Sequence, residues 1–126
     1  MSHKVLLVED DANLRGILKT MCEKEGWTTL EAEDGQIGAD TAIEHKPHLV
    51  LLDLLMPNLD GFGFLKLVRK HSDPEVSKIP VVVLSNLYTN EDILEAERLV
   101  IDGYFVKANT SLEQIIDKAK EIFEKK

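Results

Sequence analysis

An aspartate interrupts an otherwise apolar stretch of the sequence. Asp53 follows the run Leu49–Leu52 and precedes Leu54, Leu55, Met56 and Pro57. A lone buried carboxylate is costly unless it is paired, hydrogen-bonded or bound to a metal. We therefore expect Asp53 to have such partners, and its carboxylate is a candidate nucleophile.

Polar side chains follow other apolar runs in the same way. Carboxylates, a hydroxyl or an amine come directly after three more runs: Glu9, Asp10 and Asp11 after Val5–Val8, Ser85 and Asn86 after Val81–Leu84, and Lys107 after Tyr104–Val106. Helix capping accounts for Asp11, and solvent exposure accounts for Ser85 or Lys107, each taken alone. Neither predicts that four separate strands would deliver such side chains to one edge of a sheet, so we interpret the set as a functional site.

Short apolar runs alternate with longer amphipathic segments, which predicts five strands and five helices in strict alternation. The predicted strands are Val5–Val8, Trp27–Ala32, Leu49–Leu52, Val81–Leu84 and Tyr104–Val106. Apolar residues at helical spacing mark the first helix (Leu14, Ile17, Leu18, Met21) and the last (Leu112, Ile115, Ile116, Ala119, Ile122, Phe123). Thr110 with Glu113 predicts a capping box, and Gly26 and Gly103 predict helix ends.

This alternation predicts an α/β fold in which helices cover both faces of a five-stranded parallel sheet. The second run contains Thr28, Thr29 and Glu31, which is typical of an edge strand. We therefore expect the strand order 2-1-3-4-5 of a flavodoxin-like, doubly wound sheet. Ligands bind such sheets at the carboxyl ends of the strands, where the strand order reverses, so the first and third strands should bring Glu9, Asp10 and Asp53 together.

Three carboxylates in one place repel one another unless a cation is present. The cluster contains no His or Cys, so oxygen ligands favour Mg²⁺ or Mn²⁺ over zinc. Glu9, Asp10, Asp53, Lys107 and one divalent cation together balance in formal charge, so the site could accept an anion. A phosphoryl group suits a carboxylate nucleophile accompanied by a metal, a hydroxyl and a lysine.

Composition narrows the function classes. The 126 residues are enough for one domain, and a net charge of −8 opposes direct binding to nucleic acid or to an anionic membrane. The one cysteine, Cys22, falls four residues after Leu18 and is predicted to be a small core residue. With neither a signal peptide nor an apolar run long enough to span a bilayer, we expect a cytoplasmic protein.

These residues resemble the receiver domains of two-component response regulators. The resemblance runs from KVLLVEDD through LVLLDLLMPNLDGFGFL and PVVVLSN to GYFVKA, and implies a single receiver domain over residues 1–126. It implies that Asp53 is the phosphoacceptor and that Mg²⁺ is held by Glu9, Asp10, Asp53 and the backbone carbonyl of Leu55. It further implies that Ser85 and Lys107 contact the phosphoryl group and that Ser85 and Tyr104 form the conformational switch.

The resemblance also implies which proteins are partners. At two positions, however, the residue type differs from the one usual in the family. A histidine kinase or a histidine phosphotransfer protein would be the donor, and a protein of unknown identity would receive the output. Ala108 follows Lys107, where the family usually has a cis proline. Asn86 replaces a small residue, and we expect it to narrow access to Asp53.

Two other function classes fit parts of the pattern. A metal-dependent phosphatase could use Asp53 as its nucleophile, but such enzymes usually carry a general acid two residues later, where this chain has Leu55. A flavodoxin-like cofactor carrier would need to bind a phosphate beside the acidic residues Glu9, Asp10 and Asp11, which would repel it. Both alternatives are therefore weaker than the receiver domain.

Overall fold

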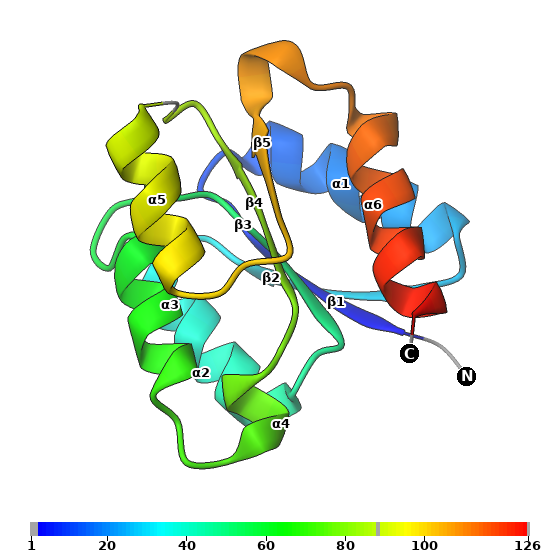
Figure 1. The fold of residues 1–126 in the computed structure, drawn as a ribbon. Coiled ribbons are helices and arrows are strands. Elements are labelled where there is room, and N and C mark those ends of the chain that lie inside the picture. Colours follow the sequence, from blue (N-terminus) through cyan, green and yellow to red (C-terminus); the bar gives the residue numbers. More distant parts are fainter. Residues whose placement is uncertain (1–2, 88, 126) are drawn as a thin grey trace.

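A parallel sheet of five strands organises the molecule, in the order β2-β1-β3-β4-β5 (Figure 1). The computed structural model describes residues 3–87 and 89–125. The strands are β1 (Lys4–Val8), β2 (Thr28–Ala32), β3 (Leu49–Leu52), β4 (Val81–Ser85) and β5 (Gly103–Val106). The predicted strand order and the edge position of the second strand are therefore confirmed.

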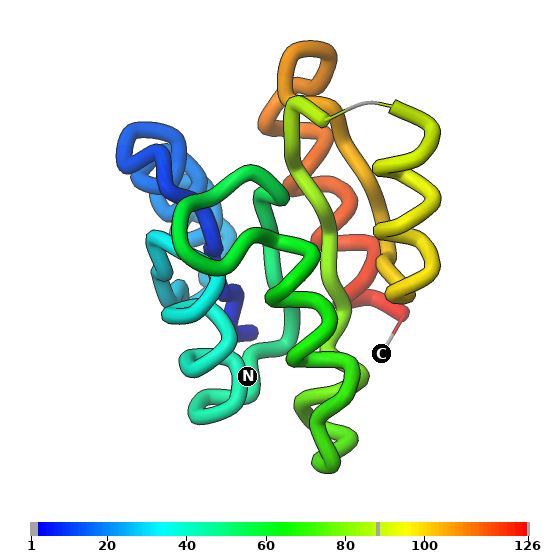
Figure 2. Tube along the Cα trace, turned by 90° about the vertical axis from the view of Figure 1, so that its left-hand side faces the viewer, coloured from blue at the N-terminus to red at the C-terminus, as the bar shows by residue number. Residues whose placement is uncertain are grey.

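Helices cover both faces of the sheet, as predicted (Figures 1 and 2). They are α1 (Ala12–Lys24), α2 (Gly35–His45), α3 (Gly61–Arg69), α4 (Pro74–Ser77), α5 (Asn90–Arg98), the short 3-10 helix η1 (Lys107–Asn109) and α6 (Leu112–Glu124). The short α4 was not predicted: Asp73 caps it and Pro74 opens it, so two helices separate β3 from β4. No helix in the described ranges is long and apolar enough to cross a membrane.

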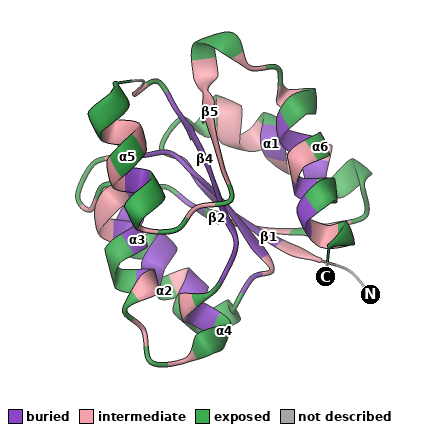
Figure 3. Cartoon of the chain, viewed as in Figure 1, coloured by how far each residue is buried: buried purple, intermediate pink, exposed green. Residues whose placement is uncertain are grey.

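The central strands are apolar on both sides because both of their faces are covered (Figure 3). One face of the sheet, with Leu6, Val8, Val50 and Leu52, packs with residues of α2 and α3. The other face, with Val5, Leu7, Leu49 and Leu51, packs with residues of α1 and α6, including the buried thiol Cys22. The predicted apolar face of α6 lies in this second cluster, whereas Ile17 of α1 is half exposed.

The start of α6 differs from the prediction by one residue. Ser111, rather than Thr110, is the N-cap, and its partner in the capping box is Gln114 rather than Glu113. The Ser111 hydroxyl accepts from the Gln114 N–H, and the Gln114 side chain accepts from the Ser111 N–H. Thr110 lies one residue before the N-cap, and its hydroxyl donates to the carbonyl of Val106 at 2.7 Å.

Of the two glycines predicted to end helices, one does so. Gly26 follows the C-cap of α1 with a positive φ of 84°. Gly103 instead begins β5, and the left-handed residue after α5 is Val100, with a φ of 59°. A β-branched residue rarely adopts this conformation, because its Cβ crowds the backbone.

We expect Val100→Gly to stabilise the protein by about 1 kcal/mol, because glycine adopts a positive φ without this strain. Val100 is 68% exposed, so little packing is lost with its side chain. Urea unfolding of the wild type and the variant measures the difference. Val100→Ala keeps a Cβ and should give a smaller gain, so equal stability of all three proteins would contradict the strain.

Candidate functional site

Three carboxylates meet where β1 and β3 end side by side. Glu9 and Asp10 follow β1, Asp53 follows β3, and one carboxylate oxygen from each lies within 4.8 Å of the others. Hydrogen bonds extend the sheet past the strand ends: the Glu9 N–H donates to Ala32 and the Asp53 N–H donates to Val8. Glu9 and Asp53 are buried, while Asp10 is exposed. The predicted meeting of these three acidic residues is thus present.

Lys107 supplies the positive charge in this acid cluster (Glu9, Asp10 and Asp53). Its Nζ lies 2.8 Å from Glu9 Oε1 and 2.9 Å from Asp53 Oδ2, so one amine bridges both buried carboxylates. Burial lowers the pKa of Lys107, but the hydrogen bonds to Glu9 and Asp53 outweigh burial and leave the pKa above its ordinary value. Lys107 is therefore held as a cation.

Burial raises the pKa of Glu9 from 4.5 to about 7, and the charge of Asp53 adds to this effect. Hydrogen bonds from Lys107 and from the Asp11 N–H act in the opposite direction. One lysine also faces three carboxylates, which leaves the acid cluster with excess negative charge. Its donors are carboxylate oxygens, a set that fits a hard divalent cation such as Mg²⁺.

The raised pKa of Glu9 predicts a pH dependence of stability. With a chelator present, the free energy of unfolding should fall as the pH rises from about 4.5 to about 7. The folded chain binds the Glu9 proton more tightly than the unfolded chain, so protonation of Glu9 stabilises the fold. This stabilisation is complete at pH values below the pKa of the unfolded chain and is lost as the pH rises through the pKa of the folded chain. Urea unfolding at several pH values, compared with Glu9→Gln, isolates the effect. The same pH dependence in both proteins would contradict it.

Ser85 and Leu55, two further predicted site residues, lie at the carboxyl ends of the strands, which point to the upper end in Figure 2. Ser85 is fully buried at the end of β4, and its Oγ accepts from the Leu87 N–H at 3.3 Å. The Leu55 N–H donates to Asp53 Oδ1 at 3.1 Å, so the backbone of Leu55 lies against the carboxylate. The Leu55 side chain is half exposed.

Tyr104 in β5 lies outside the acid cluster but is connected to the neighbouring loop. Its hydroxyl donates to the carbonyl of Leu87 at 2.7 Å, and burial raises its pKa to about 12. The ring packs against the core on the α2 and α3 side of the sheet. Tyr104 therefore contacts the loop that follows Ser85, because Leu87 lies two residues after Ser85.

The two departures from the family pattern lie next to each other. Asn86 and Ala108 line an open hollow of about 430 Å³, together with Val106 and Asn109. All described peptide bonds are trans, and Lys107, Ala108 and Asn109 form η1. The expectation that Asn86 narrows access to Asp53 stays a prediction.

Sequence reasoning missed Arg15. Its Nη1 donates to the carbonyl of Glu9 at 2.6 Å, and its Nε donates to Glu31 at 3.1 Å. Arg15 therefore holds the backbone at the end of β1 and joins it to β2. The sequence position of Arg15 could have indicated this contact. Arg15 lies one helical turn after the cap Asp11, on the side of α1 that faces the end of β1.

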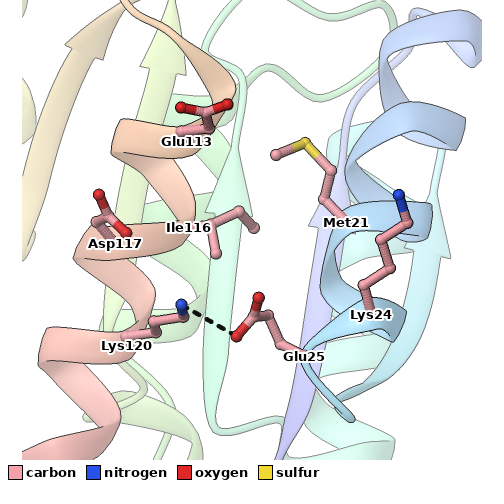
Figure 4. Close-up of a pocket in the computed structure, with 7 residues that line it drawn as sticks. All are labelled: Met21, Lys24, Glu25, Glu113, Ile116, Asp117 and Lys120. Atoms are coloured by element: carbon pink, nitrogen blue, oxygen red, sulfur yellow. Dashed lines mark ion pairs between the residues drawn. The ribbon is translucent and has the colours of Figure 1, made fainter.

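A second hollow, of about 220 Å³, lies between α1 and α6 (Figure 4). Charged side chains of both signs line it, and Lys120 pairs with Glu25 across it at 3.1 Å. None of the residues of the acid cluster lines it. It is therefore separate from the candidate site.

Similarity to known proteins defines the class of this domain. Residues 5–120 match the response regulator receiver domain, and the chain belongs to that family. It is a phosphoacceptor domain of two-component signalling rather than a conventional enzyme, and membership implies a histidine kinase partner.

Individual relatives agree with this class. The chain is 36% identical over 104 residues to the probable transcriptional regulator ycf27 of Porphyridium aerugineum, covering 82% of this chain and 41% of that protein. It is 32% identical to the transcriptional regulatory protein RprY of Bacteroides fragilis, over 82% of this chain and 42% of that protein. The chain thus spans about two fifths of the length of these curated relatives.

Solved structures share the fold over nearly the whole chain. The receiver domain of the Francisella response regulator 1452 has a TM-score of 0.87 at 28% identity, covering 98% of both chains. The chemotaxis protein CheY4 of Vibrio cholerae has a TM-score of 0.87 at 24% identity, covering 97% of this chain and 99% of that chain.

Proposed function

We propose that Asp53 is the phosphoacceptor of this receiver domain and that Glu9, Asp10, Asp53 and the Leu55 carbonyl hold Mg²⁺. One observation carries the proposal: the buried Asp53 carboxylate lies beside two further acids and 2.9 Å from the Lys107 amine. In such an arrangement the carboxylates can hold a cation and the Lys107 amine can pair with an anion, both beside the Asp53 nucleophile.

In the proposed reaction, an Asp53 oxygen forms a bond to phosphorus as the bond from phosphorus to the donor histidine nitrogen breaks. The imidazole leaves with the electron pair of that bond and is protonated from solvent. When bound, Mg²⁺ neutralises charge on the phosphoryl oxygens. Lys107 pairs with the transferred group, and the Ser85 hydroxyl donates a hydrogen bond to it.

Phosphorylation then shifts an existing equilibrium between two conformations. Ser85 and Tyr104 transmit the change, since both contact Leu87 in the loop before α5. We assign the output surface to α5, β5 and α6, and its partner is unidentified. The donor is a histidine kinase or a histidine phosphotransfer protein, residues 1–126 form one receiver domain, and the free thiol of Cys22 suits a cytoplasmic location.

The test is incubation of the protein with Mg²⁺ and a small acyl phosphate, followed by intact mass. We expect one added phosphoryl group per chain and a sharp reduction when a chelator is present. A phosphatase would instead turn over a chromogenic aryl phosphate continuously, without a stable labelled form. Turnover of that kind, or labelling that is indifferent to the chelator, would overturn the proposal.

The phosphorylated form should lose its phosphoryl group slowly. Hydrolysis needs a water held in line behind phosphorus, and the family positions nearest that path are occupied by Leu55 and Leu87, neither of which can orient a water. The double variant Leu55→Asn, Leu87→Glu should lose phosphate roughly tenfold faster than wild type after donor removal. If both leucines only pack against their loops, the two rates will be equal and the prediction wrong.

A further inference from the structure

A hydrogen bond joins α2 to the loop that follows Asp53. Asp34 is the N-cap of α2: its Oδ1 accepts from the Ile37 N–H at 2.8 Å, and its Oδ2 accepts from the Asn58 side-chain amide at 2.9 Å. Asp34 is 7% exposed whereas Asn58 is exposed, so the second bond lies partly buried at the surface. The Ile37 N–H and then the Asn58 amide lower the pKa of Asp34, which keeps it an anionic acceptor.

Neighbouring backbone groups reinforce this connection. The Gly35 N–H donates to the Leu59 carbonyl at 2.9 Å. A Cβ on Gly35 would lie 2.1 Å from that carbonyl oxygen, so only glycine permits the approach. Asn58 has a φ of 65°, a conformation that asparagine tolerates better than most residues. Residues 58 and 59 are thereby fixed against the start of α2.

The same loop is also fixed at its other end. The Gly61 N–H donates to the Leu54 carbonyl at 3.0 Å, and a Cβ on Gly61 would lie 2.5 Å from the Asp53 carbonyl oxygen. Leu55 lies between these attachments, with its N–H donating to Asp53 Oδ1. The loop from residue 54 to residue 60 is thus held against both the Asp53 backbone and α2.

We propose that Asp34 and Asn58 are positioning residues that pre-organise the Leu55 carbonyl for Mg²⁺. This inference rests on the proposed function, in which that carbonyl is a metal ligand. Without the bond between Asp34 and Asn58, the loop samples more conformations, and binding the cation must then order it at a cost in conformational entropy. The affinity for Mg²⁺ falls, although neither side chain contacts the ion.

Two substitutions remove this bond, and Asp34→Ser does so without adding the backbone freedom that glycine brings. Asp34→Ser keeps a helix cap but is too short to reach Asn58. Asn58→Gly keeps the positive φ but removes the amide. Asp73→Ser is the matched control: Asp73 caps α4 through the Glu75 N–H and bonds Lys46 Nζ at 2.9 Å, at the sheet edge opposite the acid cluster.

Isothermal titration with Mg²⁺ on the unphosphorylated chain measures the effect. We expect Asp34→Ser and Asn58→Gly each to bind Mg²⁺ about tenfold more weakly than wild type, as for other residues that orient metal ligands. The double variant should be no weaker than either single one, because both remove the same interaction. Asp73→Ser should bind like wild type, and thermal unfolding of all four variants reports any general loss of stability.

Wild-type affinity in Asn58→Gly would overturn the positioning role, as would equal weakening in Asp73→Ser. If Asp34→Ser does not fold, wild-type affinity in Asn58→Gly still overturns the role, because glycine can only loosen the loop further. The wild type separates this inference from the proposed function. Mg²⁺ binding and Asp53 labelling in the wild type, with unchanged affinity in the variants, would refute only the positioning role. No binding and no labelling in the wild type would refute both.

Discussion

Replacing Asp53 with asparagine will abolish Mg²⁺-dependent labelling by a small phosphodonor. The asparagine amide has nearly the shape of the carboxylate, and its oxygen can still accept from the Leu55 N–H, so the loop geometry is kept. The amide is a far weaker nucleophile and carries no charge to pair with Lys107. Intact mass after incubation with donor and Mg²⁺ should therefore show only unmodified protein.

Asp102→Asn is a suitable control for this experiment. Asp102 accepts a hydrogen bond from the Val81 N–H just before β5, at the opposite edge of the sheet from the acid cluster. It should be labelled like wild type. Equal labelling of Asp53→Asn and wild type would place the acceptor elsewhere and would remove the basis of the proposed reaction.

Replacing Lys107 with alanine will separate metal binding from phosphoryl transfer. The Lys107 amine bonds Glu9 and Asp53, which are also proposed Mg²⁺ ligands, so the amine competes with the cation for their oxygens. Without it, Mg²⁺ should bind at least as tightly. The labelling rate should fall about 100-fold, because the negative charge of the transferred phosphoryl group is no longer stabilised by the amine.

Calorimetric titration with Mg²⁺ and labelling rates at saturating Mg²⁺ measure the two effects separately. Lys118→Ala is the control, because Lys118 pairs only with Glu121 on the same helix at 3.6 Å among the described ion pairs. A normal labelling rate in Lys107→Ala would contradict the role of the amine. Weaker Mg²⁺ binding would show that Lys107 organises the acid cluster rather than competing for it.

The sequence by itself determined the architecture and the members of the acid cluster. Strand and helix periodicity are local properties, and burial of both faces leaves the central strands uniformly apolar. The carboxyl ends of parallel strands all lie at the same end of the sheet. Because the first and third strands are neighbours in the inferred order, Glu9, Asp10 and Asp53 had to meet there. No knowledge of side-chain geometry was needed for that step.

Only the tertiary structure decided which of several neighbouring groups forms each contact. Thr110 and Ser111 are both good cap residues, and in the structure α6 begins after Ser111, whose side chain forms the capping box with Gln114, while Thr110 bonds Val106. The left-handed conformation of Val100 likewise depends on how the chain must turn between packed elements, which no local pattern specifies. The short α4, by contrast, begins with a local signal, Asp73 followed by Pro74.

The same holds for the contacts that tune the site. Lys107, in η1, bridges Glu9 and Asp53 although the preceding strand β5 is adjacent to neither β1 nor β3. Asp34 likewise reaches Asn58 across 24 residues of sequence. Hydrogen bonds and ion pairs act over about 3 Å, so their partners are set by the final positions of side chains rather than by residue type or spacing.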